Sequence, residues 1–182
     1  MRALLAALAL LIGVLIAPPA QAAADTNLAA GKPATASSST DVYTAANVTD
    51  GNQSTYWESA NNALPQWIQV DLGTSASINR LVLELPAGWP GRTQTLTVQA
   101  STNGTAFTTI AASATHTFNP TATITLTPTT TRHVRLQITA NTGWPAGQLA
   151  EFEIWGSTPD NPGDGTNLAL GKTITESSHT HT

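Results

Sequence analysis

The chain has 182 residues, a formal net charge of −4, only 10% charged residues and no cysteine. So few cations exclude a basic patch, and we therefore expect neither a nucleic acid nor an anionic membrane surface as a partner. Without cysteines there is no disulfide, so the fold must be held together by its core or by a bound metal.

The N-terminus has the features of a secretory signal peptide over residues 1–22. Arg2 precedes an uncharged apolar run from Leu4 to Ile16, and two prolines follow that run. The triplet Ala20–Ala22 is typical of a signal-peptidase site. The alternative is a transmembrane anchor, but the run is shorter than the roughly 20 apolar residues that span a bilayer. We therefore predict a secreted, extracellular protein.

A loop rich in Asp, Asn and Thr follows at residues 47–57, around Gly51. Such loops can turn several oxygen atoms inward, and hard cations such as Ca²⁺ bind roughly six to eight oxygen ligands. The spacing is not that of an EF-hand. An ordinary Asx turn is the alternative, because Asp-Gly often marks such turns. From the residues alone, both interpretations stay open.

Apolar and polar residues alternate with a period of two through the body of the chain, residues 27–156. This alternation, together with many Thr, Val and Ile residues, predicts half-buried strands. Turn-forming clusters such as 101–104 separate the strands, and no segment shows sustained helical spacing. The core-facing residues are predicted to be Ile68, Val70, Leu72, Leu81, Leu83, Leu85, Leu96, Val98, Ala100, Ile124, Leu126, Val134, Leu136, Ile138, Ala150, Phe152 and Ile154. Short strands at regular intervals predict an all-β antiparallel sandwich or barrel.

Four aromatic residues fall in expected loops: Tyr43, Trp57, Trp89 and Trp144. Trp89 and Trp144 lie beside glycine and proline, which is a poor setting for a strand and a good one for an indole that meets a sugar ring. Arg92 is close to Trp89, and its planar fork of donors suits sugar hydroxyl groups. The alternative is that such aromatics fill the ends of a sandwich. We predict that role for Trp67 and Trp155, because both lie in strand patterns.

Recognisable catalytic motifs are absent from the sequence. It contains no Gly-x-Ser-x-Gly elbow, no His-Glu-x-x-His run and no phosphate loop. Glu151 and Glu153 share one strand face, whereas a glycosidase needs two carboxylates that face each other across the bond, about 5–9.5 Å apart. We therefore predict that the chain is not an enzyme, and that Glu151 has a metal-binding or structural role.

The beginning of the domain is repeated near the end of the chain. Asn27–Lys32 recurs as Asn167–Lys172 with a single difference. The intervening residues just before the second copy are rich in Pro, Gly and Asp, which is typical of a linker. The predicted organisation is a signal peptide at 1–22, one domain at 25–157, a linker at 158–166 and the truncated start of a second repeat at 167–182.

Five short motifs occur in order along the domain: Asn27–Pro33, Asp50–Asn52, Thr55–Trp57, Gln66–Gly73 and Ala150–Phe152. Together they resemble the F5/8 type C, or discoidin, domain, and in particular the bacterial family 32 carbohydrate-binding modules. The resemblance covers residues 27–156. It implies a jelly-roll β-sandwich that holds a structural calcium ion. The implied calcium ligands are the backbone carbonyls of Asn47, Asn52 and Ala150, the carboxylate of Glu151, and Asp50 and Thr55.

The resemblance also implies sugar contacts from loops at one end of the sandwich. Arg92 matches an arginine ligand of galactose-binding relatives, and Trp144 lies where relatives place an aromatic residue. Tyr43 replaces a frequent histidine, which argues against galactose. The segments 55–59 and 141–146 are similar to those of modules attached to α-1,3-glucanases, whereas Glu58 favours an amino sugar such as the glucosamine of chitosan. The predicted ligand-binding residues are Tyr43, Trp57, Glu58, Trp89, Arg92 and Trp144.

These features predict a monomeric, non-catalytic module that binds a polysaccharide or oligosaccharide and holds a larger polysaccharide-degrading enzyme on it. One alternative is an adhesion or lipid-binding discoidin domain, although the loops carry few cations for a membrane. The other is a small enzyme, or a fragment of a glycoside hydrolase whose catalytic domain is absent.

Overall fold

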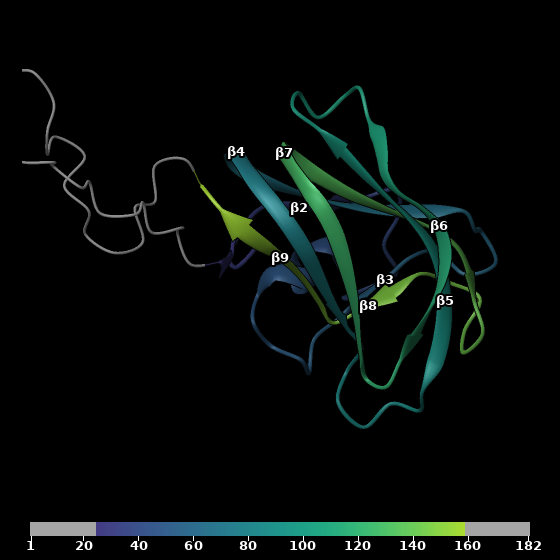
Figure 1. The fold of residues 1–182 in the computed structure, drawn as a ribbon. Coiled ribbons are helices and arrows are strands. Elements are labelled where there is room, and N and C mark those ends of the chain that lie inside the picture. The colour runs from purple at the N-terminus through teal and green to yellow at the C-terminus, as the bar shows by residue number, and fades with distance from the viewer. Residues whose placement is uncertain (1–24, 159–182) are drawn as a thin grey trace, which may run out of the picture.

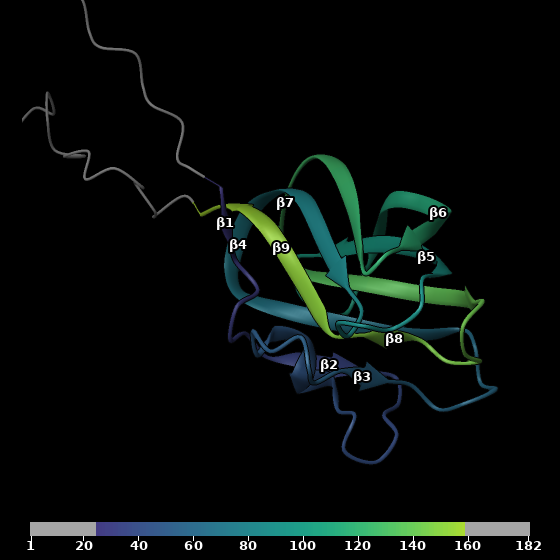
Figure 2. The ribbon, with the colours of Figure 1, turned by 90° about the horizontal axis from the view of Figure 1, so that it is seen from below.

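The computed structural model describes residues 25–158 of the chain. Two long strands lie within this part. Strand β4 (Gln66–Glu84) pairs antiparallel with β7 (Thr121–Asn141), from Gln66 opposite Ile138 to Glu84 opposite Thr121. The register shifts after Asp71 and again after Ile78, so the pair is irregular at two points. Figure 2 shows β4 curving from one layer of the fold into the other. The predicted signal peptide, and the second repeat with nearly all of the linker, lie outside the described residues.

The other strands extend the two halves of this pair into two layers. In the first layer β2 pairs with β4, while β5 pairs with the C-terminal part of β7 and β6 pairs with β5. In the second layer β9 pairs with the far half of β4, and β1 pairs with β9. Their bounds are β1 Thr26–Asn27, β2 Ala34–Ala36, β5 Arg92–Ser101, β6 Thr108–Phe118 and β9 Glu151–Ser157. The arrangement in Figure 1 confirms the predicted all-β antiparallel jelly-roll sandwich.

Three short elements close one side of the sandwich: the 3-10 helix η1 (Ala45–Thr49) and strands β3 (Trp57–Glu58) and β8 (Gln148–Leu149). β3 and β8 form a separate two-stranded sheet, with Trp57 opposite Leu149 and Glu58 opposite Gln148. This pairing joins the early loops of the domain to its last loop. Within the described residues, no helix is long and apolar enough to cross a membrane.

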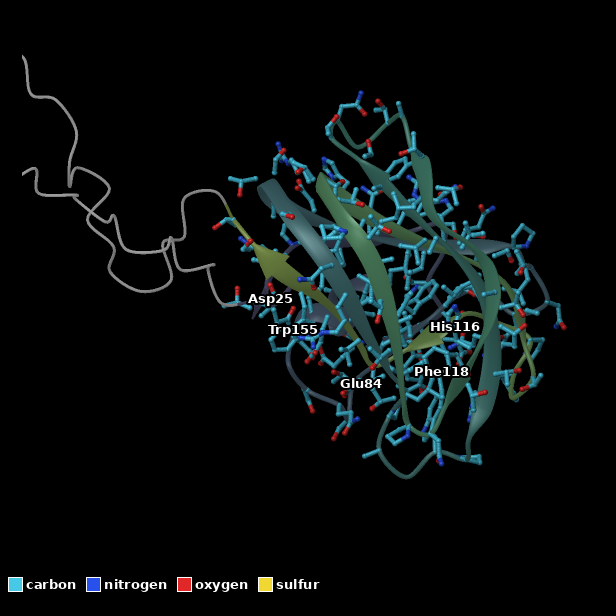
Figure 3. All side chains as sticks on the ribbon, viewed as in Figure 1. Asp25, Glu84, His116, Phe118 and Trp155 are labelled. Carbon is cyan, nitrogen blue, oxygen red and sulfur yellow. The ribbon has the colours of Figure 1, made fainter. Side chains whose placement is uncertain are left out.

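The core lies between the layers and contains every residue that the alternation predicts to face inward. Their burial follows from strand geometry, since successive side chains point to opposite faces. Phe118, at the end of β6, is fully buried with them (Figure 3). Burial of apolar area on this scale is the dominant favourable contribution to folding.

Trp57 also lies in the core, and its predicted contact with a ligand is therefore wrong. Its side chain has 0% exposure, and the indole Nε1 donates a hydrogen bond of 2.9 Å to the backbone carbonyl of Ser38. A Cβ on Gly147 would lie only 3.0 Å from the indole ring, so the last loop packs directly on Trp57. Because alternate residues of a strand face opposite ways, Trp57 points into the core while Glu58, the other residue of β3, points to the opposite face.

Trp67 and Trp155 do not fill the ends of the sandwich, contrary to our prediction. Both are half-buried, and each indole is covered by an arginine on the same strand layer. The Arg135 guanidinium lies 4.3 Å from the Trp67 ring centroid, and Arg80 lies 4.7 Å from that of Trp155. Figure 3 shows Trp155 near Asp25, at the edge where the chain enters the domain. These indoles are outward-facing residues of their strands, and cation–π contacts shield them from solvent.

A bidentate ion pair holds the first irregularity of β4. Arg132 donates from Nε and Nη2 to the two carboxylate oxygens of Asp71, at 2.7 and 2.8 Å. The backbone N–H of Gly73, which has φ of 84°, donates to the same carboxylate at 2.8 Å. The Arg132 hydrogen bonds are the main reason that the pKa of Asp71 falls from 3.8 to about 2. Asp71 therefore connects this irregular part of β4 to β7.

We expect Asp71→Asn to lower the free energy of unfolding at neutral pH. The difference in this free energy between the parent and the variant should become smaller in acid. A carboxyl whose pKa is lowered in the folded state stabilises that state above the unfolded pKa of about 3.9, and this stabilisation is lost as the pH falls through about 2. Urea unfolding of the parent and the variant between pH 7 and pH 2 measures the effect. Asp25→Asn, at an exposed aspartate outside the Arg132 ion pair, is the control. A constant difference between parent and Asp71→Asn across this range would contradict the assignment.

We expect Trp57→Phe to lower the free energy of unfolding by about 1–3 kcal/mol, because the partly buried Ser38 carbonyl loses its hydrogen-bond donor. The smaller ring also leaves unfilled space, which adds to the loss. Equilibrium urea unfolding measures the difference. Trp155→Phe is the matched control and should cost less, since its indole lies on the outer face. A variant of unchanged stability that no longer binds sugar would restore the original prediction for Trp57.

Candidate functional site

A cleft of about 310 Å³ opens at the end of the sandwich, where three separate parts of the chain meet. The first part is the region of β3, the second is the turn before β5 with the start of that strand, and the third is the loop that leads into β8. The cleft is lined by Tyr56, Glu58, Trp89, Pro90, Arg92, Gly143, Trp144 and Gln148. Both aromatic and polar side chains therefore face the same hollow.

The floor of the cleft is a connected network of polar side chains. Gln148 Nε2 donates to Glu58 Oε2 at 2.8 Å, directly across the β3–β8 pair. Arg92 Nη1 donates to Gln148 Oε1 at 2.7 Å, so one amide links the carboxylate to the guanidinium. Gln94 then anchors the Gln148 backbone, donating to its carbonyl at 2.8 Å and accepting from its N–H at 3.2 Å. Because each group is satisfied by the next, the network is held rigidly in place.

Trp144 forms an exposed wall whose edge is fixed. Its indole Nε1 lies 2.9 Å from Asn61 Oδ1 and 3.2 Å from Glu58 Oε1, and it donates to these acceptors. The residue is nevertheless 46% exposed. An indole with its polar edge anchored and much of its surface in solvent offers a flat apolar surface at little entropic cost.

The opposite wall is built from packed rings. The Arg92 guanidinium carbon lies 4.7 Å from the centroid of the Trp89 ring, and Trp89 meets Tyr56 edge-on at 4.7 Å. Burial lowers the pKa of the Arg92 guanidinium, yet an arginine stays charged at neutral pH. A Cβ on Gly143 would fall 2.6 Å from Arg92 Nε, so a larger residue here would displace the guanidinium.

The structure brings four of the six predicted ligand residues together: Glu58, Trp89, Arg92 and Trp144. Trp57 lies beneath them in the core. Tyr43 does not line the cleft. Its ring stacks on Tyr56, with centroids 4.3 Å apart, and faces a neighbouring hollow.

Sequence reasoning missed Tyr56 and Gln148. For Tyr56 a signal was available, because the alternation of a strand places residues 56 and 58 on the face opposite Trp57. Burial is the main cause of the raised pKa of Tyr56, so its phenol stays neutral. Gln148 carried no local signal, since its position depends on pairing with a strand 90 positions away.

The predicted calcium loop forms a compact turn after η1. The Asp50 carboxylate accepts from the Asn52 N–H at 2.8 Å, and the Thr55 hydroxyl lies 2.7 Å from its other oxygen. The side chain of Asn47 donates to the Tyr56 carbonyl at 2.8 Å. The Asx turn, our alternative interpretation, is therefore present. It is compatible with a cation, because the Thr55 hydroxyl lies within 2.8 Å of both an Asp50 carboxylate oxygen and the Asn52 carbonyl.

Glu151, at the start of β9, is buried beside this loop. Its Oε1 atom is inaccessible to solvent and has no hydrogen-bond partner. Burial, and secondarily the charge of nearby Asp50, raise the pKa of Glu151 to about 7. The neighbouring carboxylates of Asp50 and Glu151 repel each other unless a proton or a cation lies between them. Residues 25–158 contain no group of three His, Cys, Asp or Glu side chains suited to a metal, so a cation here would need backbone carbonyls as well.

Comparisons with known proteins agree with this geometry. Residues 33–152 match the family model of the F5/8 type C domain. No curated protein sequence matches the chain significantly. Among solved structures, chitosan-binding module 1 from a chitosanase/glucanase of Paenibacillus sp. IK-5 is 35% identical, with a TM-score of 0.61, and the match covers 72% of this chain and 99% of that one.

Two further structures extend the comparison. Chitosan-binding module 2 of the same Paenibacillus enzyme, solved with chitotriose, is 31% identical with a TM-score of 0.61, and the match covers 71% of this chain and 100% of that one. The family 32 carbohydrate-binding module of C. perfringens NanJ, solved with galactose, shares the fold at 22% identity and a TM-score of 0.63, with 72% and 98% covered. This chain therefore belongs to the F5/8 type C domain family, and its β-sandwich is that of the family 32 carbohydrate-binding modules.

Proposed function

We propose that this chain is a secreted, non-catalytic module that binds chitosan, a polysaccharide of glucosamine. The observation that carries the proposal is the cleft in which the exposed Trp144 indole stands beside the Glu58 carboxylate, 3.2 Å from its Oε1 atom. An apolar ring face next to a fixed acid is complementary to a pyranose that bears an ammonium group. The identity to two chitosan-binding modules supports the same choice.

The aromatic wall and the polar floor account for sugar binding in general. The C–H groups of a pyranose ring pack on an aromatic face, and a few fixed polar groups orient its hydroxyls. Trp144 offers the exposed indole, and Arg92 has guanidinium N–H groups beyond the one that binds Gln148. Because both are already held by neighbours, little conformational entropy would be lost on binding.

Glu58 is the reason to favour an amino sugar. It is 7% exposed, and both of its oxygens accept hydrogen bonds from neutral donors, Trp144 and Gln148. No cation among residues 25–158 forms an ion pair with it, since Arg92 binds Gln148 instead. A nearly buried carboxylate without a cationic partner is costly, and an ammonium group of the ligand would supply that partner.

The same cleft does not favour catalysis. Glu58 is the sole carboxylate among the residues that line it, whereas glycoside hydrolysis ordinarily uses a facing pair. The proposed role is to hold an attached polysaccharide-degrading enzyme on its substrate. Its support is that both chitosan-binding modules derive from a chitosanase/glucanase. Secretion rests on the signal-peptide pattern of residues 1–22. Action as a monomer rests on the cleft being lined by residues of one chain.

We also propose a structural calcium ion at the loop after η1. Asp50 and Glu151 would supply carboxylate oxygens, and Thr55 and the carbonyls of Asn47, Asn52 and Ala150 would supply the rest. The unpartnered Oε1 of buried Glu151 fits such an ion, because a buried polar atom ordinarily has a partner. The ion would join the first loops to β9 in a chain that has no disulfide.

We expect Glu58→Gln to lower the affinity for chitosan oligosaccharides by roughly tenfold or more, since a charge-assisted hydrogen bond contributes about 1.5–3 kcal/mol. The affinity for N-acetylated oligosaccharides, which carry no ammonium group, should change less. Isothermal titration at low and high salt measures both, and the parent should lose affinity for chitosan as salt rises.

Trp144→Ala should weaken the binding of both oligosaccharides, because it removes the ring surface rather than the charge. Glu153→Gln, which removes a carboxylate outside the cleft, is the matched control and should bind as the parent does. Circular dichroism confirms that each variant is folded. Equal affinities of parent and Glu58→Gln for chitosan would exclude the amino-sugar assignment. Unchanged binding by Trp144→Ala would exclude the cleft as the sugar-binding site.

We expect calcium to raise the melting temperature of the purified protein and a chelator to reverse the increase. A ligand that binds only the folded state stabilises it by about 2.7 kcal/mol at a concentration 100 times its Kd. Asp50→Ala should abolish the response, whereas Asp25→Ala should retain it. Differential scanning calorimetry measures these shifts. The same melting curve for the parent in calcium and in chelator would remove the ion from the proposal.

A further inference from the structure

A second hollow of about 280 Å³ adjoins the cleft and shares Tyr56 with it. Its lining residues all come from the segment between β2 and β3, which includes η1. The hollow is lined by Val42, Tyr43, Asn47, Ser54, Thr55 and Tyr56. None of these side chains carries a formal charge at neutral pH, so the surface combines aromatic and apolar groups with hydroxyl and amide groups.

Exposed apolar side chains mark both hollows. Among the described residues, only Val42 and Trp144 are large hydrophobic side chains with high exposure, at 67% and 46%. Each borders one of the two hollows. A single exposed apolar residue is ordinary on a protein surface, but one that borders a hollow beside a candidate binding site is a feature of that site.

A continuous row of rings joins the two hollows. Tyr43 stacks on Tyr56 at 4.3 Å with an interplanar angle of 20°, and Tyr56 meets Trp89 edge-on at 4.7 Å. Trp89 is in turn covered by Arg92 of the cleft. The row therefore extends without a break from the second hollow to the guanidinium that binds the polar floor.

The second hollow is also held rigidly to the cleft. Asn47 Nδ2 donates to the carbonyls of both Val42 and Tyr56, at 3.3 and 2.8 Å, so one amide fixes its two sides. The Glu58 N–H donates to the Tyr43 carbonyl at 3.2 Å. The strand that presents the carboxylate of the cleft is thus bonded directly to the segment that presents Tyr43. Two preorganised hollows at fixed separation suit one continuous ligand.

We propose that the hollow at Val42, Tyr43 and Tyr56 is a second subsite, which binds further sugar rings of the same polysaccharide chain that occupies the cleft. This inference rests on the proposed function. A linear polysaccharide is the occupant that the geometry favours, because the two hollows are continuous through Tyr56 and both combine aromatic rings with hydrogen-bonding side chains. The subsite makes affinity depend on ligand length, since additional units gain contacts without a second loss of translational freedom.

The test compares a glucosamine dimer with a glucosamine hexamer by isothermal titration. The parent should bind the hexamer several-fold more tightly than the dimer. Val42→Ser should lower the affinity for the hexamer towards that for the dimer and leave the affinity for the dimer unchanged. Val42 is well exposed, so this variant should fold normally. Tyr43→Leu, which removes the ring that stacks on Tyr56, should act in the same direction.

Two further variants make the outcomes distinct. Ala46→Ser places a serine at an exposed position of η1 that borders neither hollow, and it should bind both ligands as the parent does. If Val42→Ser and Tyr43→Leu keep the full hexamer affinity while Trp144→Ala loses both ligands, the cleft stands and the second subsite is wrong. An equal loss of dimer and hexamer in Val42→Ser would also overturn the subsite. Unchanged binding of both ligands by Trp144→Ala would instead overturn the proposed function.

Discussion

The candidate site depends on the pairing of two very short strands, β3 and β8. Their register puts Glu58 opposite Gln148, and one hydrogen bond of 2.8 Å between the side chains completes the contact. Without that pairing the carboxylate would not lie beside Trp144, and Arg92 would lose the amide that orients it. The rest of the sandwich serves to hold these two-residue strands at a fixed separation, through the core that Trp57 fills from below.

Only 10% of the residues are charged, so the partner of each charged side chain is informative about its role. Arg92, Arg80 and Arg135 each cover an aromatic ring, and Arg132 forms the ion pair with Asp71. Glu58 and Glu151 are the two buried carboxylates among the described residues, and neither forms an ion pair there. These two carboxylates lie at the two places where we propose that a positive charge arrives from outside, as a sugar ammonium group and as a calcium ion.

The proposed calcium loop and the proposed subsites are parts of one connected surface. Asn47 and Thr55 belong both to the loop after η1 and to the lining of the second hollow. Tyr56 lines both that hollow and the cleft. A cation that orders the loop would therefore also order the surface on which a polysaccharide chain lies, because the same backbone supports both.

The sequence by itself determined the strands, the inward-facing core residues and the family, because each depends on local alternation or on short motifs in order. It also identified Glu58, Trp89, Arg92 and Trp144 as candidate ligand residues. Only the tertiary structure decided that Trp57 is buried, that Tyr43 lies outside the cleft, and that Gln148 joins Glu58 to Arg92. The physical reason is that these outcomes arise from contacts between strands up to 90 positions apart, whose register no local pattern specifies.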